Sequence, residues 1–301
     1  MSVPSESWRG ALQELALVLV AMDLARILAM MQIVMFTSGR AGKSLTPDRL
    51  PPSIAGQLWT LVPYGQGKAY NDAGHGNVQE TPEGVTGIAK RRQWCLEQLA
   101  TTDKVVMLDD DLRFDTRRTD DLSKFIVSTP QEVEELFVDI DNQLNKYKHL
   151  GVMTREGGNF HGEAGQYIEV GRATRVHGLR VQDVRALGCR FDRLPLMEDM
   201  DMTLQLLRLG HPNVIVNYMV QGQGMSNAPG GCSVYRTPDL QAQAANGLAE
   251  LHRPHVKTVE REVKSNWGEG FNKRLDVQVQ WQKAYEEGKR RASGVEQKEL
   301  L

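Results

Sequence analysis

Three consecutive aspartates, Asp109, Asp110 and Asp111, are the strongest chemical signal in the sequence. They follow the apolar run KVVML at residues 104–108, which is typical of a buried strand. Adjacent carboxylates repel one another, and a divalent cation between them relieves that repulsion. Oxygen ligands suit Mg²⁺ or Mn²⁺, so we expect Asp109 and Asp111 to bind such an ion. An acidic turn that caps the next element is the alternative interpretation.

A second acidic motif, Glu198-Asp199-Met200-Asp201, stands at the start of a helix predicted over residues 198–209. The positive end of a helix dipole keeps carboxylates ionised at that position. An ionised carboxylate can deprotonate a hydroxyl group, so Asp199 and Glu198 are the candidate catalytic residues. Simple helix capping is the alternative. Lone histidines are more often structural than ligands, but the position of His252 makes it a candidate third metal ligand.

Two other chemistries have weaker support. Residues 37–44 (TSGRAGKS) nearly spell a Walker A phosphate loop, which would indicate a P-loop kinase acting on nucleic acid. However, Thr37 stands where the first glycine should be, and Pro47 and Pro51 preclude the long helix that must follow such a loop. Glycoside hydrolysis also uses paired carboxylates, but it needs no triplet.

Strands and helices are predicted to alternate along the chain. Apolar runs predict strands at residues 32–37, 58–63, 104–108 and 150–154, with more extended structure at 168–184. Helical spacing predicts helices starting at Pro82, over 131–148 and 198–209, and near the end at 277–289. This order predicts an α/β, Rossmann-like fold with a mixed, mostly parallel sheet flanked by helices. Ligands of such sheets bind beyond the carboxyl ends of the strands, where residues 37–39 and the aspartates would lie.

Charge and cysteine content limit the class of protein. The 36 Lys and Arg residues against 38 Asp and Glu give a formal net charge of −2, so the total charge does not indicate a nucleic-acid binder. Any contact with a polyanion must be local, and the arginine-rich residues 172–193 are the best candidate; an ordinary solvated surface is the alternative. Cys95, Cys189 and Cys232 lack disulfide or zinc spacing, which favours a reducing cytoplasm.

The ends of the chain are predicted to lie outside the catalytic unit. Residues 11–31 are apolar, but Glu14, Asp23 and Arg26 interrupt them, so we expect an amphipathic helix rather than a membrane span. A translation start at Met30 or Met31 is the second interpretation. We expect a helical extension over residues 1–30, one domain over 31–292 and a flexible tail over 293–301. The sequence leaves the oligomeric state open and indicates no membrane partner.

Longer phrases resemble a known family. FTSGRAGKS, VVMLDDDLRF and RVHGLRVQDVRALGCRFDRLPLMEDMDMTLQLLRLGHPN are similar to the phage branch of the TET-associated glycosyltransferases, as is VKSNWGEGFNKRLDVQVQWQKAY near the end. The likeness extends from about Met31 to Tyr285. It implies a GT-A fold and a nucleotide-sugar donor, with a UDP-sugar as the first expectation. It also implies Mn²⁺ or Mg²⁺ at the Asp triplet and transfer to a 5-hydroxymethylpyrimidine, first of all 5-hydroxymethylcytosine, in phage DNA within the host cytoplasm.

The resemblance also assigns roles. Asp109 and Asp111 look like the metal pair, Asp110 like a contact to the donor sugar, and Asp199 like the carboxylate nearest the reacting centre, supported by Glu198. The other expected donor contacts are Thr37, Ser38, Arg40, Lys43 and Arg91, and the expected contacts to the acceptor or DNA are Arg155, Arg175, His177 and Arg180. A protein, lipid or saccharide acceptor remains an alternative, as does a catalytically inactive binding module.

Overall fold

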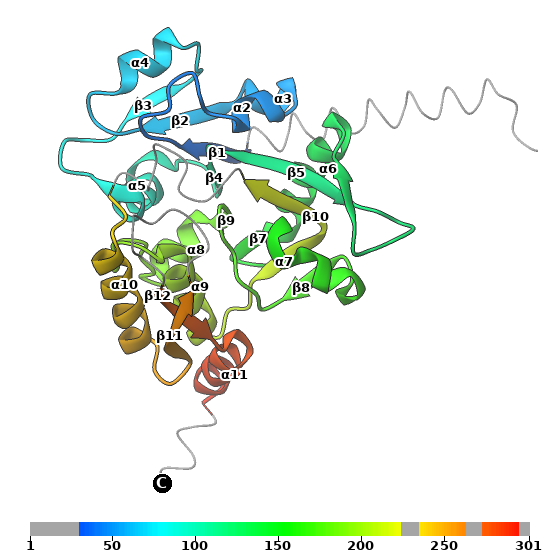
Figure 1. Cartoon of the computed structure of the whole chain (residues 1–301), viewed down its shortest axis with the longest axis vertical. Helices are drawn as coiled ribbons and strands as arrows, with labels where there is room; N and C mark the ends of the chain where they lie inside the picture. The colour runs from blue at the N-terminus through cyan, green and yellow to red at the C-terminus, as the bar shows by residue number, and fades with distance from the viewer. Residues whose placement is uncertain (1–29, 224–234, 263–272, 295–301) are drawn as a thin grey trace, which may run out of the picture.

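The computed structural model describes residues 30–223, 235–262 and 273–294. Its centre is a 10-stranded sheet of order β3-β2-β1-β4-β9-β7-β10-β5-β6, with β8 paired to β10 (Figure 1). The strands are β1 (Met31–Phe36), β2 (Leu58–Val62), β3 (Val78–Glu80), β4 (Lys104–Asp109), β5 (Leu112–Arg117), β6 (Phe125–Val127), β7 (His149–Thr154), β8 (Tyr167–Glu169), β9 (Val176–Arg180) and β10 (Val214–Gln223).

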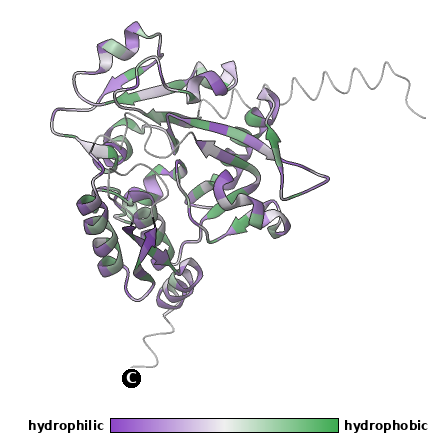
Figure 2. Cartoon of the chain, viewed as in Figure 1, coloured by the Kyte–Doolittle hydropathy of each residue, from purple (hydrophilic) through white to green (hydrophobic). Residues whose placement is uncertain are grey.

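The strand directions make the sheet mixed but mostly parallel. β1 pairs in parallel with β2 and β4, β2 with β3, and β7 with β10. β9 runs antiparallel between β4 and β7, and β5 runs antiparallel to β10. The predicted α/β fold, with its mostly parallel sheet flanked by helices, is confirmed. Figure 2 shows hydrophobic segments along the central strands, as expected for strands that are covered on both faces.

Helices cover both faces of the sheet. The described helices are α2 (Thr46–Arg49), α3 (Pro52–Ala55), α4 (Gly67–Asp72), α5 (Gly87–Trp94) with the π-helical turn η1 (Cys95–Leu99), α6 (Pro130–Leu144), α7 (Arg155–Gly158) with the 3-10 turn η2 (Asn159–Ala164), α8 (Val181–Ala186), α9 (Glu198–Arg208), α10 (Pro238–Leu251) and α11 (Trp281–Ala292). One apolar cluster packs α6 against the sheet, and another packs η1, α8 and α9 against the opposite face. A third joins α9 and α10 to the two-stranded sheet of β11 (Val256–Glu262) and β12 (Lys273–Val279).

Three predicted boundaries were wrong. The helix expected from Pro82 begins at Gly87, because the Thr81 N–H instead donates to the Val62 carbonyl at 2.9 Å and extends the pairing beside β2. Residues 181–186 form α8 rather than extended structure. The last predicted helix began too early, because residues 273–279 form β12 and α11 starts at Trp281.

The ends of the chain are only partly described. Residues 1–29 of the expected N-terminal helix and residues 295–301 of the expected tail lie outside the described residues. A single catalytic domain over residues 31–292 remains a prediction. In the described part of the chain, no helix is long and apolar enough to span a membrane.

Candidate active site

The Asp triplet lies at the carboxyl edge of the sheet, at the end of β4. Phe36, the last residue of β1, is paired in register with Asp109, so Thr37 and the triplet leave the sheet side by side. The Asp109 N–H donates to the carbonyl of Arg175, just before β9, at 3.0 Å. The prediction that the first loop and the aspartates share one edge is confirmed.

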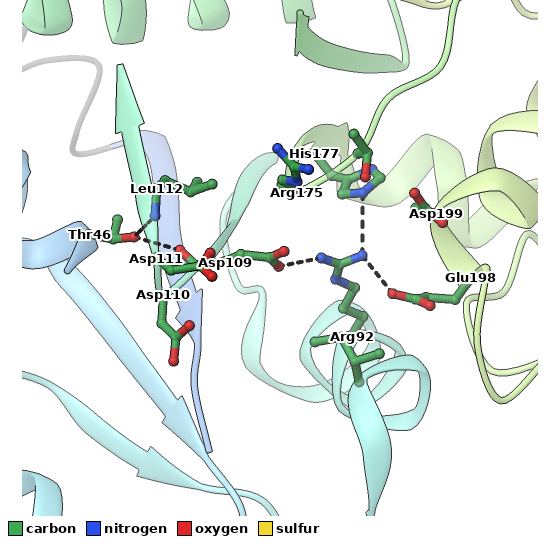
Figure 3. A network of polar contacts seen from close by, with 12 residues as sticks. Thr46, Arg92, Asp109, Asp110, Asp111, Leu112, Arg175, His177, Glu198 and Asp199 are labelled. Atoms are coloured by element: carbon green, nitrogen blue, oxygen red, sulfur yellow. Dashed lines mark hydrogen bonds and ion pairs between the residues drawn. The ribbon is translucent and has the colours of Figure 1, made fainter. Parts of the chain in front are cut away.

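Asp110 fastens the first loop to this edge. Its carboxylate accepts hydrogen bonds from the Thr37 hydroxyl at 2.5 Å and from the Arg40 guanidinium at 2.6 Å. Its carbonyl accepts from the backbone N–H groups of Leu45 and Thr46 at 2.7 and 3.0 Å. Asp111 also lies 3.6 Å from the Arg40 guanidinium. Asp109, in contrast, points toward Arg92 (Figure 3).

Tyr70 of α4 completes this arrangement and was not predicted from the sequence. Its buried hydroxyl lies 2.8 Å from the Thr37 hydroxyl oxygen and accepts the Arg40 backbone N–H at 2.9 Å. Arg91 of α5 is also buried and donates to the Thr37 carbonyl at 2.7 Å. Arg40, Thr37, Arg91 and Asp110, all expected at the donor, are therefore brought together.

The other two expected donor residues lie in the same loop. Ser38 is half-buried and Lys43 is exposed, with the Lys43 N–H closing a turn on the Arg40 carbonyl at 2.8 Å. The helix that follows this loop, α2, has only 4 residues. A P-loop needs a long helix whose N-terminus faces the phosphates, so the kinase alternative has no structural support.

Arg92, next to Arg91 on α5, joins the two acidic motifs. Its buried guanidinium donates to the Asp109 carboxylate at 2.8 Å and to the Glu198 carboxylate at 2.9 Å (Figure 3). It also lies 3.4 Å from the ring of His177. Sequence reasoning missed this role because Arg91 and Arg92 are equally basic neighbours, and only the packing of α5 decides which of them faces the carboxylates.

The two carboxylates at the start of α9 have opposite pKa shifts. Burial raises the pKa of Glu198 to about 7, a rise that the nearby Asp199 charge reinforces and the Arg92 charge opposes. Burial also acts to raise the pKa of Asp199, but the charges of Arg172 and Arg92 and a hydrogen bond from Thr174 outweigh it, so that pKa is lowered. Arg172 donates to Asp199 at 3.2 Å. Asp199 is therefore ionised at neutral pH, whereas Glu198 readily binds a proton.

Asp109 and Asp111 are carboxylates whose negative charge is incompletely compensated. Burial and the charges of neighbouring aspartates raise the pKa of Asp111 to about 6, and burial with the charge of Asp110 also raises that of Asp109. The side chain of Asp109 nevertheless stays 31% exposed, so it is open to a ligand. A divalent cation would supply the missing positive charge, and these two residues could hold it. Among the described residues, no three His, Cys, Asp or Glu side chains form a complete metal site, so the remaining ligands would come from a substrate or water.

The structure places His252 on Asp201, not on the Asp triplet. Its Nε2 atom lies 2.6 Å from the Asp201 carboxylate and its Nδ1 atom 3.4 Å from the Arg208 guanidinium. Both ring nitrogens are therefore engaged in the interior. Asp201 follows Asp199 by two residues, or about 200° around the helix, so it points away from the site. The proposed third metal ligand is corrected to a structural partner of Asp201.

Two of the four expected acceptor contacts are also misplaced. His177 is fully buried, stacked on His149 with ring centroids 5.5 Å apart, and burial lowers its pKa well below the usual value. This neutral ring cannot contact DNA. Arg180 pairs in register with Lys104 at the start of β4, which is the opposite edge of the sheet from Asp109, and it forms an ion pair with Asp183.

Arg175 and Arg155 do lie at the site edge. Arg175 has a left-handed backbone, with φ of 62°, and its guanidinium donates to Glu156 at 3.0 Å. Its charge acts to lower the pKa of both Asp109 and Asp111, as expected of a cation close to the pair. Arg155 follows β7 directly and forms an ion pair with the buried Asp115 of β5.

The mixed α/β fold, with the acidic end of β4 joined through Arg92 to the acidic start of α9, is of the GT-A type. Residues 31–231 match the TET-Associated Glycosyltransferase family, and the chain belongs to that family. It is 24% identical over 243 residues to the "Beta-glucosyl-HMC-alpha-glucosyl-transferase" of Enterobacteria phage T6, an alignment that covers 74% of this chain and 81% of the relative.

Solved structures resemble the fold. The mannosyltransferase PcManGT from Pyrobaculum calidifontis, described in complex with GDP-Man and Mn²⁺, matches with a TM-score of 0.51 at 12% identity. The match covers 74% of this chain and 64% of the mannosyltransferase, so this chain spans less than two thirds of that protein. GalNAc-T7, described with UDP, GalNAc and Mn²⁺, has a TM-score of 0.42 at 12% identity, over 73% of this chain and 48% of the GalNAc-T7 chain.

Proposed function

We propose that this glycosyltransferase moves a sugar from a nucleotide-diphosphate donor to a 5-hydroxymethylpyrimidine of DNA, with 5-hydroxymethylcytosine as the first candidate. The observation that carries the chemistry is the continuous network of Asp109, Arg92 and Glu198. It joins the aspartates suited to a cation to the first turn of α9, where Asp199, the residue after Glu198, is an ionised carboxylate suited to a hydroxyl group. The name of the phage T6 relative supports the acceptor.

Asp109 and Asp111 would hold Mn²⁺ or Mg²⁺, completed by oxygens of the donor diphosphate. The ion would stabilise the negative charge that develops on the leaving nucleoside diphosphate. Thr37, Ser38, Arg40 and Lys43 would contact the donor, for which a UDP-sugar is the first candidate. Arg91, through the Thr37 carbonyl, and Asp110, through Arg40, would fix the shape of this loop.

Asp199 would act on the acceptor. As the bond between the sugar C1 and the diphosphate oxygen breaks, a bond forms between C1 and the acceptor hydroxyl oxygen, and Asp199 takes the hydroxyl proton. Its pKa stays low because Arg172 and Arg92 compensate its charge. Glu198, whose pKa is raised, would hold Arg92 in place rather than take this proton.

The relative's name also supports a second acceptor, since it describes an α-glucosyl transfer to β-glucosyl-HMC. The hydroxyl group would then belong to a sugar already attached to the base. This is a specific form of the saccharide alternative, and the same Asp199 chemistry would serve it.

Mass spectrometry of modified oligonucleotides tests the proposal. Duplexes with 5-hydroxymethylcytosine, with or without a β-glucosyl group, are incubated with the protein, Mn²⁺ and a panel of nucleotide sugars, with and without chelator. We expect a chelator-sensitive gain of one sugar mass on one duplex. Donor hydrolysis without any mass gain would move the acceptor away from DNA. A salt titration provides a second test, because transfer to DNA should weaken steeply as ionic strength rises.

A further inference from the structure

An exposed apolar surface lies beside the site and has no role in the chemistry described above. It combines the β5–β6 hairpin with the loop of residues 155–165, and its most exposed side chains are Phe160 at 84% and Val127 at 77%. Leu122, at the hairpin end, is also exposed. Exposed apolar side chains grouped in one region are typical of a binding surface.

Buried polar side chains of β5 and β10 hold the loop that carries Phe160. Arg117, buried in β5, donates to the Gly158 carbonyl at 3.1 Å and to the Asn217 side-chain oxygen at 2.8 Å. Asn217, buried in β10, donates in turn to the carbonyls of His161 and Gly165 at 2.8 and 2.7 Å. These buried polar side chains fix the loop backbone on both sides of Phe160. The exposed ring is therefore carried by a backbone with a defined conformation.

The loop also packs closely on the hairpin. A Cβ atom at Gly158 would lie 3.4 Å from the Phe125 ring, and one at Gly162 would lie 2.7 Å from the Leu122 carbonyl oxygen. Phe160 lies between these two glycines in the sequence, so its exposed ring belongs to a loop that packs on the hairpin. Phe160 and Leu122 form part of the same surface.

This surface begins at the edge that carries the Asp triplet. Val106 of β4 and Leu150 of β7 both pair antiparallel with Gly178 of β9, so β4 and β7 run in the same direction. Their carboxyl ends, at Asp109 and Thr154, therefore lie at the same edge of the sheet. Arg155 starts the loop there, and α7 lies beside β7 and β10 (Figure 1).

Arginines flank the surface on the side of the site. Arg155 and Arg113 share one carboxylate, that of the buried Asp115, so this group carries an excess of positive charge. Arg175 lies closer to the triplet. Apolar aromatic surface with arginines beside it is the combination that contacts bases and phosphates of nucleic acid.

We propose that Phe160 stacks on the bases of duplex DNA next to the acceptor base, filling the space that this base leaves when it enters the site. The proposal rests on the DNA acceptor proposed above. A hydroxymethyl group inside a duplex must leave the stack to reach Asp199, and an inserted apolar side chain offsets the cost of unstacking. Arg155 and Arg113 would contact the neighbouring phosphates.

The test compares transfer to duplex and single-stranded oligonucleotides of the same sequence, each with one acceptor base. Phe160→Ala should lower kcat/KM on the duplex by roughly 5- to 150-fold, the effect of losing one base–aromatic stack. Transfer to the single strand, where no base pair must open, should change less than about twofold. Phe160→Trp should retain duplex activity. The matched control is Leu209→Ala, an exposed apolar side chain at the far end of α9 from Glu198.

A second measurement reports the base directly. A duplex with 2-aminopurine beside the acceptor base should gain fluorescence on binding the wild-type protein and gain less on binding Phe160→Ala. Equal losses of activity on both oligonucleotides, or no loss on the duplex, would overturn the stacking role while leaving the DNA acceptor intact. A wild-type protein that modifies neither oligonucleotide would overturn the acceptor, and the stacking role with it.

Discussion

The Arg92 guanidinium lies 2.8 Å from the Asp109 carboxylate and 2.9 Å from that of Glu198, so it connects the end of β4 to the first turn of α9. The arginine side chain is 3% exposed and that of the aspartate 31%. Arg92 is thus fixed in the interior, while its partner is open toward a ligand. Because the same guanidinium also binds Glu198, a change at either acidic motif affects the other.

Arg92→Lys should lower kcat at least 10- to 100-fold with a smaller effect on KM for the donor. An ammonium group is a point charge and cannot replace the planar guanidinium that reaches two separated carboxylates. Steady-state kinetics measure the change, and thermal unfolding checks that the variant folds. Lys90→Met, an exposed position on the same helix, is the control. Equal activity in Arg92→Lys and wild type would remove the bridge from the mechanism.

Asp111→Asn should reduce transfer by roughly 1,000-fold or more, because a metal ligand that stabilises the leaving group contributes several kcal/mol. It should also raise the melting temperature of the metal-free protein, because the variant lacks the Asp111 charge, which burial and the charges of Asp109 and Asp110 disfavour. A transfer assay measures the loss of activity, and calorimetry with chelator and then with Mn²⁺ measures the change in melting temperature. Mn²⁺ should stabilise the wild type and not the variant. Full activity of Asp111→Asn would contradict the metal assignment.

The sequence predicts β1, β2, β4, β7 and α9 well, because each is an apolar run or an amphipathic segment with clear ends. It does not reveal β5, because the residues LRFDTR include two charged side chains that are buried, Asp115 and Arg117. Asp115 and Arg117 are buried there because Arg155 and Asn217, distant in sequence, compensate them. No local pattern records such long-range pairing.

The sequence predicts the carboxylates of the candidate site, but it does not predict the residues that hold them in place. Strand direction alone brings Thr37 and Asp109 to one edge. The choice of Arg92 over Arg91, and the separation of His252 from the aspartates, depend on how far each helix is rotated when it packs. A shift of one residue turns a helix by about 100°, which spacing along one sequence cannot resolve.

Stability of the metal-free protein should fall as pH rises from about 5 to 7, in part because of Glu198. Its pKa in the folded protein is raised from 4.5 to about 7, so its contribution is fully present below 4.5 and is lost as pH rises through 7. The loss is on the order of 3 kcal/mol. Glu198→Gln should lack this component, and its melting temperature should overtake that of wild type near neutral pH. If the melting temperatures of both proteins changed in the same way with pH, the raised pKa of Glu198 would be contradicted. Because the pKa of Asp199 is lowered, this group titrates below pH 5 and does not affect the comparison of the two proteins between pH 5 and 7.

His252→Ala should destabilise the protein without changing its affinity for metal. The substitution removes the His252 hydrogen bond, at 2.6 Å, from the fully buried Asp201 carboxylate, which keeps Gln205 and Arg193 as partners. The cost is roughly 1–3 kcal/mol in the free energy of unfolding. Denaturant titration measures that cost, and Mn²⁺ binding is measured at a temperature where the variant is folded. Asp111→Asn is the opposite control, with weak Mn²⁺ binding and no loss of stability. A His252→Ala protein that binds Mn²⁺ as weakly as Asp111→Asn would restore His252 as a ligand. Unchanged Mn²⁺ affinity would leave Asp109 and Asp111 as the protein's carboxylate ligands, with the remaining positions open to the donor.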